Sequence, residues 1–326
     1  MSAKLGYKSH LQLGTEPAWG TPAAPTLSLP FINESFKPSR ETVESASIRG
    51  TRGQSDGTDG IYDCGGSFSF EVDPDNICFI LKHAMGAPQT TYAGDGAYEH
   101  VFTLKDTLQS MTGEVDRDGF VFQVLGAMIE SLHFSEDGKG ILKCEVGCDA
   151  WKDMPYNYST AVYSTAKPFN FKDVGMGALI NSTPNYYIKG FDLSLANNNK
   201  KDYRSYASGI FRGDIPVGRA KINGSLPMNF ETDEEFIRFW GDAGGPIKDP
   251  ATNQLQTTFL SNQQIGTSQY YKSIMFYMGN VRYESVDAGV KGPEPLDQTI
   301  PYRAFETAAG LANDLQITVV NGMASF

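Results

Sequence analysis

Apolar and polar residues alternate along the stretch Gly66-Ser67-Phe68-Ser69-Phe70-Glu71-Val72-Asp73. A period of two is typical of a β-strand that has one buried face and one solvated face. The two phenylalanines and the valine would face the core, and the serines and the glutamate would face water. This stretch therefore predicts an antiparallel sheet with one wet face.

The same pattern returns in the second half of the chain, in Gly224-Ser225-Leu226-Pro227-Met228-Asn229-Phe230-Glu231-Thr232-Asp233. Matching residues stand 160 positions apart, as Phe70 and Phe230 do, and as Ile77 and Ile237 do. Internal repeats of this kind indicate repeated structural units. We therefore predict a duplicated chain whose halves share one arrangement of strands and helices.

A short helix is predicted after each of these two strands. Asp75 would open the first helix and Asp233 the second, because an aspartate carboxylate can cap the free N–H groups of a first turn. Gly86-Ala87-Pro88 and Gly244-Gly245-Pro246 would end them, since proline cannot continue a helix. The predicted fold class is mainly β with short helices, one in each half.

The chain is predicted to have three parts: an extended N-terminal arm over residues 1–25, a first domain over 26–160 and a second over 161–326. The arm is rich in proline and glycine near its end and is not expected to be a core element. Residues 45–62 are rich in Gly, Ser, Thr and Asp and have little to bury. That composition predicts a long mobile loop.

The chain is acidic, with 27 Lys+Arg against 38 Asp+Glu and a net charge of −11. Sequence-independent binding of nucleic acid needs a surplus of Lys and Arg to displace counterions, so the charge argues against it. The same charge argues against docking on an anionic membrane. No run of about 18 apolar residues is present, so we expect no membrane span, and the first residues predict no secretory signal.

Catalytic and metal-binding motifs are absent from the sequence. The four histidines stand in no nucleophile or zinc motif and are expected to be solvated or structural. Cys144 and Cys148 lie on the apolar side of an alternating stretch, which predicts a buried strand face rather than a metal pair. The Asp-Gly steps predict turns rather than calcium sites. We expect no enzyme activity, no metal and no cofactor.

Several segments carry a resemblance to a known family: residues 6–22, which begin Gly6-Tyr7-Lys8-Ser9-His10, then Glu41-Thr42-Val43-Glu44-Ser45, Ile48-Arg49-Gly50-Thr51-Arg52, Gly65-Gly66-Ser67-Phe68-Ser69-Phe70-Glu71 and Leu315-Gln316-Ile317-Thr318-Val319-Val320-Asn321. They resemble the tail tube (major tail) proteins of bacteriophages with long, non-contractile tails. The resemblance spans most of the chain.

The resemblance implies two tandem domains, each a β-sandwich or partial barrel flanked by one helix. It implies sheets joined edge to edge in rings, and rings stacked into the virion tail tube through which DNA leaves. A duplicated chain would need three copies per ring, with six as the alternative. Implied partners are other copies of the chain, a tape-measure protein and tail tip or terminator proteins, with assembly in the bacterial cytoplasm. The DNA would pass without specific binding.

Three sets of site residues follow from this resemblance. An acidic lumen would repel DNA, and its wall candidates are Glu71, Glu231, Ser67, Ser69, Ser225 and Asn229. Candidates for contacts between stacked rings are Ile48, Arg49, Gly50, Arg52, Asp56 and Asp59, together with Ile210 and Arg212 in the matching loop over 204–218. Trp19 is the candidate anchor of the arm on a neighbouring subunit.

Other functions remain open at this point. Another phage tail ring component, such as a terminator or distal tail protein, would share the fold. A carbohydrate-binding β-sandwich would suit the 16 tyrosines and three tryptophans. A glycoside hydrolase would need paired carboxylates, whose separation the sequence does not give.

Overall fold

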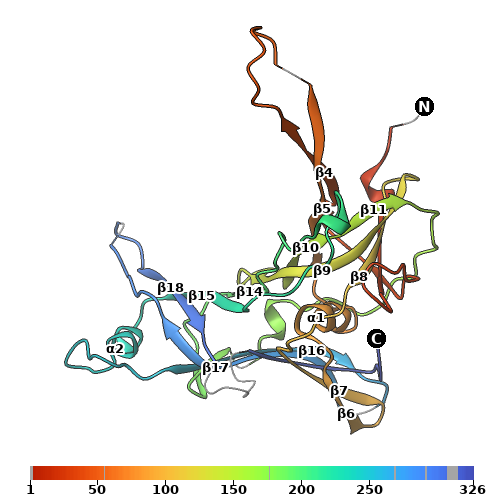
Figure 1. Cartoon of the computed structure of the whole chain (residues 1–326). Helices are drawn as coiled ribbons and strands as arrows, with labels where there is room; N and C mark the ends of the chain where they lie inside the picture. Colours follow the sequence, from red (N-terminus) through yellow and green to blue (C-terminus); the bar gives the residue numbers. More distant parts are fainter. Residues whose placement is uncertain (1–2, 55, 176, 268, 291, 307–314) are drawn as a thin grey trace.

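The chain folds mainly into β-structure (Figure 1), which confirms the predicted class. The computed structural model describes residues 3–54, 56–175, 177–267, 269–290, 292–306 and 315–326. Within these ranges it contains nineteen strands, two α-helices and three short 3-10 turns.

The strands up to residue 155 are β1 (His10–Thr15), β2 (Leu27–Leu29), β3 (Asn33–Glu34), β4 (Lys37–Glu44), β5 (Gly57–Glu71), β6 (Gln89–Gly94), β7 (Ala97–Thr103), β8 (Met111–Asp116), β9 (Val121–Glu136), β10 (Lys143–Ala150) and β11 (Lys152–Pro155). The later strands are β12 (Ala178–Ile180), β13 (Thr183–Asn185), β14 (Phe191–Ala196), β15 (Lys221–Asn229), β16 (Asn253–Gln264), β17 (Tyr271–Tyr283), β18 (Asp297–Ala304) and β19 (Gln316–Asn321). The helices are α1 (Ile77–Met85) and α2 (Glu234–Trp240), and the 3-10 turns are Gly6–Lys8, Phe171–Asp173 and Tyr206–Ser208.

Antiparallel pairing builds a large sheet in the spatial order β5–β10–β9–β14–β15–β18–β17. Strand β14 joins the two halves, because one of its edges pairs with β9 and the other with β15. A smaller sheet, β2–β1–β8–β9–β11, shares the first part of the long strand β9. The two sheets therefore diverge along one strand.

The order of strands recurs between the halves. In the first half the neighbours run β5–β10–β9–β8, and in the second they run β15–β18–β17–β16. Helix α1 follows β5, and helix α2 follows β15. Each half thus contains a strand, a helix and a three-strand meander whose last strand returns to the first.

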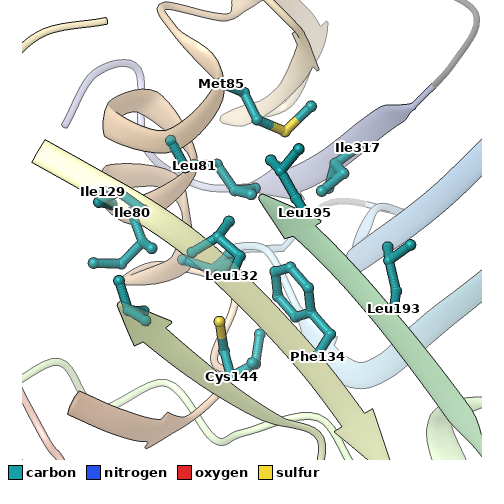
Figure 2. Close-up of a cluster of buried hydrophobic side chains, with 14 of the residues drawn as sticks. Ile80, Leu81, Met85, Ile129, Leu132, Phe134, Cys144, Leu193, Leu195 and Ile317 are labelled. Carbon is teal, nitrogen blue, oxygen red and sulfur yellow. The ribbon is translucent and has the colours of Figure 1, made fainter. Parts of the chain in front are cut away.

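The core gathers around α1, which lies beside β9 in the middle of the molecule (Figure 1). Figure 2 shows Ile80 and Leu81 of α1 among Leu132 of β9, Leu195 of β14 and Ile317 of β19. All five side chains are buried. Each contributes about 1.5–3 kcal/mol by leaving water, and together they join both halves in one core.

The predicted extended arm is wrong for residues 10–15. Strand β1 pairs with both β2 and β8 and buries Leu11 and Leu13 completely. Gln12, between them, is also buried, and its amide donates a hydrogen bond of 2.7 Å to the Ser159 carbonyl. A strand buried on both faces shows no clean alternation, so its pattern was missed. Residues 1–2 of the arm lie outside the described ranges.

The predicted helix caps need correction. Before α1 the capping carboxylate belongs to Asp73, which accepts hydrogen bonds from the backbone N–H groups of Asp75 and Asn76. Asp75 instead pairs with Lys272 of β17 at 2.9 Å. Asp233 stands at the predicted position before α2, but its side chain makes no capping hydrogen bond. Helix α2 ends earlier than expected, at Gly241, which adopts a positive φ of 87°.

Candidate functional site

One face of the large sheet is polar across six strands from both halves. Pairs that stand directly opposite on adjacent strands share a face, and the register links Ser69 to Glu145, Glu145 to His133, His133 to Ser194 and Ser194 to Asn223. We call this surface the polar face and define it by Ser67, Ser69, Glu71, Ser131, His133, Ser135, Lys143, Glu145, Asp192, Ser194, Lys221, Asn223, Ser225, Asn229, Asp297 and Arg303.

The opposite side of the same strands is apolar. Phe68 and Phe70 of β5, Phe134 of β9, Leu193 of β14 and Met228 of β15 are buried there. The alternation predicted for β5 and β15 is therefore present in the structure. Of the two faces of this sheet, the polar face is the one open to water in the single chain.

Five of the six predicted lumen residues lie on the polar face, whichever half they come from. The exception is Glu231, an exposed residue beyond the end of β15. Glu145, His133 and Asp192 also belong to this face, although they were not among the predicted lumen residues. The strand β14 does alternate, as Phe191-Asp192-Leu193-Ser194-Leu195, so a signal for part of the set was present.

The polar face carries charges of both signs. Four acids and three Lys or Arg residues belong to it by the definition above. Lys143 stands opposite Glu71 in register, and Nε2 of His133 lies 3.0 Å from the Asp192 carboxylate. The face is thus close to neutral, whereas the predicted lumen wall was acidic.

A β-hairpin built from β4 and β5 projects from the body of the molecule (Figure 1). The predicted mobile loop over 45–62 is wrong for residues 57–62, which belong to β5. Every residue of β4 is exposed, so water on both faces removes the alternation that would have revealed a strand. The candidates Ile48, Arg49, Gly50, Arg52, Asp56 and Asp59 all lie on this hairpin and are exposed.

The tip of the hairpin presents apolar surface to water. Ile48 is 98% exposed, and Val43 on β4 is more than half exposed. Near the middle, Nη1 of Arg40 lies 2.7 Å from the Asp59 carboxylate. A two-stranded ribbon with no covered face is only marginally stable by itself, so this hairpin is suited to gaining a partner.

The matching loop over 204–218, which was predicted to contact the next ring, packs against β5 of its own chain. Arg212 is only 6% exposed, and its Nη2 lies 2.6 Å from the Asp63 carboxylate of β5. The Ile210 carbonyl accepts a hydrogen bond of 2.9 Å from the Tyr62 N–H. Arg212 is thus buried and paired at the base of the hairpin within its own chain, and its predicted contact between rings stays a prediction.

Trp19 packs on its own chain. The centroid of its ring lies 5.3 Å from that of the Trp151 ring. Glu16 holds the segment around Trp19 in place by hydrogen bonds. The buried Glu16 carboxylate accepts hydrogen bonds from the Gly20 N–H at 2.7 Å and the Gly126 N–H at 2.8 Å. These contacts give Trp19 an intrachain partner, and the predicted anchoring on a neighbouring subunit stays a prediction.

Within the described ranges, no three His, Cys, Asp or Glu side chains gather in a way that could hold a metal ion. The four cysteines are free and buried, and burial raises the pKa of the Cys64 thiol to about 12. Cys144 and Cys148 lie in the core as predicted. The two surfaces that the described residues bring out are the polar face and the hairpin.

A family comparison agrees with this geometry: residues 6–304 match the model of the phage tail tube protein family. The chain belongs to this family. A search of curated proteins finds no match to it. As a tail tube protein it is a structural component of the virion tail that self-assembles into a tube. Of the helices that the structure describes, none is long and apolar enough to cross a membrane.

Proposed function

We propose that three copies of this chain close a ring in which six similar units alternate, and that stacked rings form the conduit for DNA ejection. The supporting observation is the recurring strand order, β5–β10–β9–β8 and β15–β18–β17–β16. It favours a duplication with domains over 26–160 and 161–326. Closing a ring also removes open sheet edges, which otherwise pair without control.

The polar face is the proposed wall of the lumen. Its continuity across six strands from both halves is the observation that carries this assignment. Small hydroxyl side chains and balanced charges offer DNA few cations to bind, since phosphate contacts depend on free Lys and Arg. DNA would then slide past without specific binding.

The β4–β5 hairpin is the proposed contact between stacked rings. It projects from the body, exposes Ile48 and Val43, and is held at its base by the Asp63–Arg212 pair. Burying its apolar tip on the next ring would supply the partner that an isolated ribbon lacks. Contacts with tape-measure and tail tip or terminator proteins, and assembly in the host cytoplasm, belong to the same proposal.

Electron microscopy of the purified protein, combined with the mass of a single ring, tests the proposal. Hollow tubes with three chains per layer are the expected result. Six chains per layer would retain the tube and contradict the duplicated ring. Closed rings that never stack would instead favour a terminator or distal tail role.

A further inference from the structure

The two helices that follow the repeated strands differ sharply in their surroundings. In α1 eight of nine residues are buried, all except Lys82. The second half supplies part of this cover, because Leu195 of β14 and Ile317 of β19 belong to the same buried cluster as Leu81 (Figure 2). Helix α1 is thus enclosed by the contact between the halves.

Helix α2 has no comparable cover. Only Glu235 is buried among its seven residues, and its carboxylate accepts a hydrogen bond of 2.7 Å from the Tyr283 hydroxyl. Phe236, Ile237 and Trp240 are only half-buried. In Figure 1, α2 lies at the far side of the molecule from α1, beyond β15 and β18.

The strand that completes the cover of α1 has a counterpart in the first half. On β14, Asp192 pairs with Ser225 and Ser194 pairs with Asn223. On β4, Lys37 pairs with Gly65 and Ser39 pairs with Asp63. The partners on β5 and β15 stand 160 positions apart in both cases, so β4 occupies beside β5 the place that β14 occupies beside β15.

The free edges also correspond. The second edge of β14 pairs with β9, whereas the second edge of β4 pairs with no strand in the part of the chain that the structure describes. A second copy that repeats the contact between the halves would bring its β4 beside the second half of the first copy. In that arrangement the first half of the second copy would cover α2 of the first copy.

We propose that the exposed side of α2 is the docking site for the first half of a second copy, with β4 of that copy in the role that β14 has over α1. This inference rests on the proposed ring. Charge favours it, since Arg40 of β4, which stands where Leu195 stands on β14, would meet the exposed carboxylates of Asp233 and Glu234. The Arg40 guanidinium and its aliphatic stem are also suited to packing on the half-buried indole of Trp240.

Cross-linking tests the contact directly. The double variant Pro38→Cys, Ile237→Cys is assembled and treated with a short bismaleimide; the four native cysteines are buried and give little background. We expect a ladder on denaturing gels that ends at three chains, and no ladder from either single variant. The matched control pairs Ile237→Cys with Phe120→Cys, which is exposed at the turn between β8 and β9 and should give no ladder.

A second variant separates this inference from the proposed function. Trp240→Glu should weaken ring formation by about tenfold or more, since it removes a large apolar anchor, whereas Ile48→Arg should leave rings intact. Circular dichroism checks that the Trp240→Glu variant folds. If it does not fold, the cross-linking experiment alone tests the inference. Tubes of the Pro38→Cys, Ile237→Cys variant that give no cross-link, or normal rings from folded Trp240→Glu, would overturn this inference and leave the proposed function in place. Wild-type protein that forms neither rings nor tubes would overturn the proposed function with it.

Discussion

The Arg212 guanidinium lies 2.6 Å from the Asp63 carboxylate and so fastens the second half of the chain to the base of the β4–β5 hairpin. A second cation, Arg204, contacts the same carboxylate oxygen at 2.8 Å. Arg212 is buried, whereas Asp63 is partly open to water. The hairpin is free along its length but fixed where it leaves the sheet.

Replacing Arg212 by alanine should lower the free energy of unfolding by about 1.5–3 kcal/mol, the range for hydrogen bonds to charged groups. Chemical denaturation of the unassembled chain measures the change. Arg40→Ala is the matched control, because its pair with Asp59 is exposed and should contribute less than about 1 kcal/mol. Equal losses of unfolding free energy from the two variants would contradict a stabilising role of the Arg212–Asp63 pair at the hairpin base.

Acid should destabilise the chain through His83. Burial lowers the pKa of His83 from 6.5 to about 4. The ring is held neutral between the Thr15 hydroxyl, 3.0 Å from Nε2, and the Gln109 carbonyl, 2.8 Å from Nδ1. Above pH 6.5 the histidine is neutral in both states; between pH 6.5 and 4 only the unfolded chain gains the proton, so stability falls by about 3 kcal/mol.

The measurement compares the free energy of unfolding of wild type and His83→Gln across this pH range. The other titrating groups are common to both proteins, so the difference isolates the histidine. The variant should lose less stability on acidification. Parallel pH profiles would show that His83 does not carry this dependence.

Truncating two adjacent residues of β5 should change the free energy of unfolding by very different amounts. Phe70→Ala removes a fully buried ring and should cost about 3–5 kcal/mol. Ser69→Ala, on the polar face, should stay within about 0.5 kcal/mol in the unassembled chain. Thermal or denaturant unfolding of both variants checks the assignment of the two faces, and a large loss from Ser69→Ala would refute it.

A charge at the hairpin tip should stop stacking but not ring closure. Ile48→Arg places a cation on the apolar tip, and burying it against another ring would be costly. We expect rings of normal mass and few long tubes by electron microscopy and sedimentation. Phe120→Arg, at an exposed residue outside the hairpin, is the control and should still give tubes. Normal tubes from Ile48→Arg would remove the tip from the interface between rings.

Cations added to the polar face should slow DNA ejection. Glu71→Lys combined with Glu145→Lys places lysines where DNA would pass, and lysines bind phosphate. Ejection from assembled virions should slow most at low salt, because screening weakens the attraction. The double variant Glu71→Gln, Glu145→Gln is the control, because it removes the two negative charges without adding cations. Unchanged kinetics from normally assembled double-lysine particles would place the polar face elsewhere than the lumen.

The local patterns of the sequence predicted much of the fold. The alternation in residues 66–71 and 224–229 correctly assigned the faces of β5 and β15, and the glycine-proline signal located the end of α1. The burial of Cys144 and Cys148 followed from the same reasoning. These features depend on neighbours a few residues apart, which is the range over which side-chain periodicity acts.

Features without a local signal were missed. Strand β1 is buried on both faces and β4 on neither, so neither alternates. Arg212 was predicted to contact another ring, although it pairs with Asp63, 149 positions away along the chain. Sequence order alone does not say which distant charge a side chain will meet, so the burial of Arg212 became visible only in the folded chain.

The sequence by itself determined that this is a β-rich chain with repeated strands, each with one wet and one buried face. The tertiary structure alone decided that the wet faces of both halves form one surface, because β14 sets the register between β9 and β15. It also decided that α1 is enclosed while α2 stays open. Periodicity assigns a residue to a face, but long-range pairing of strands determines which faces meet.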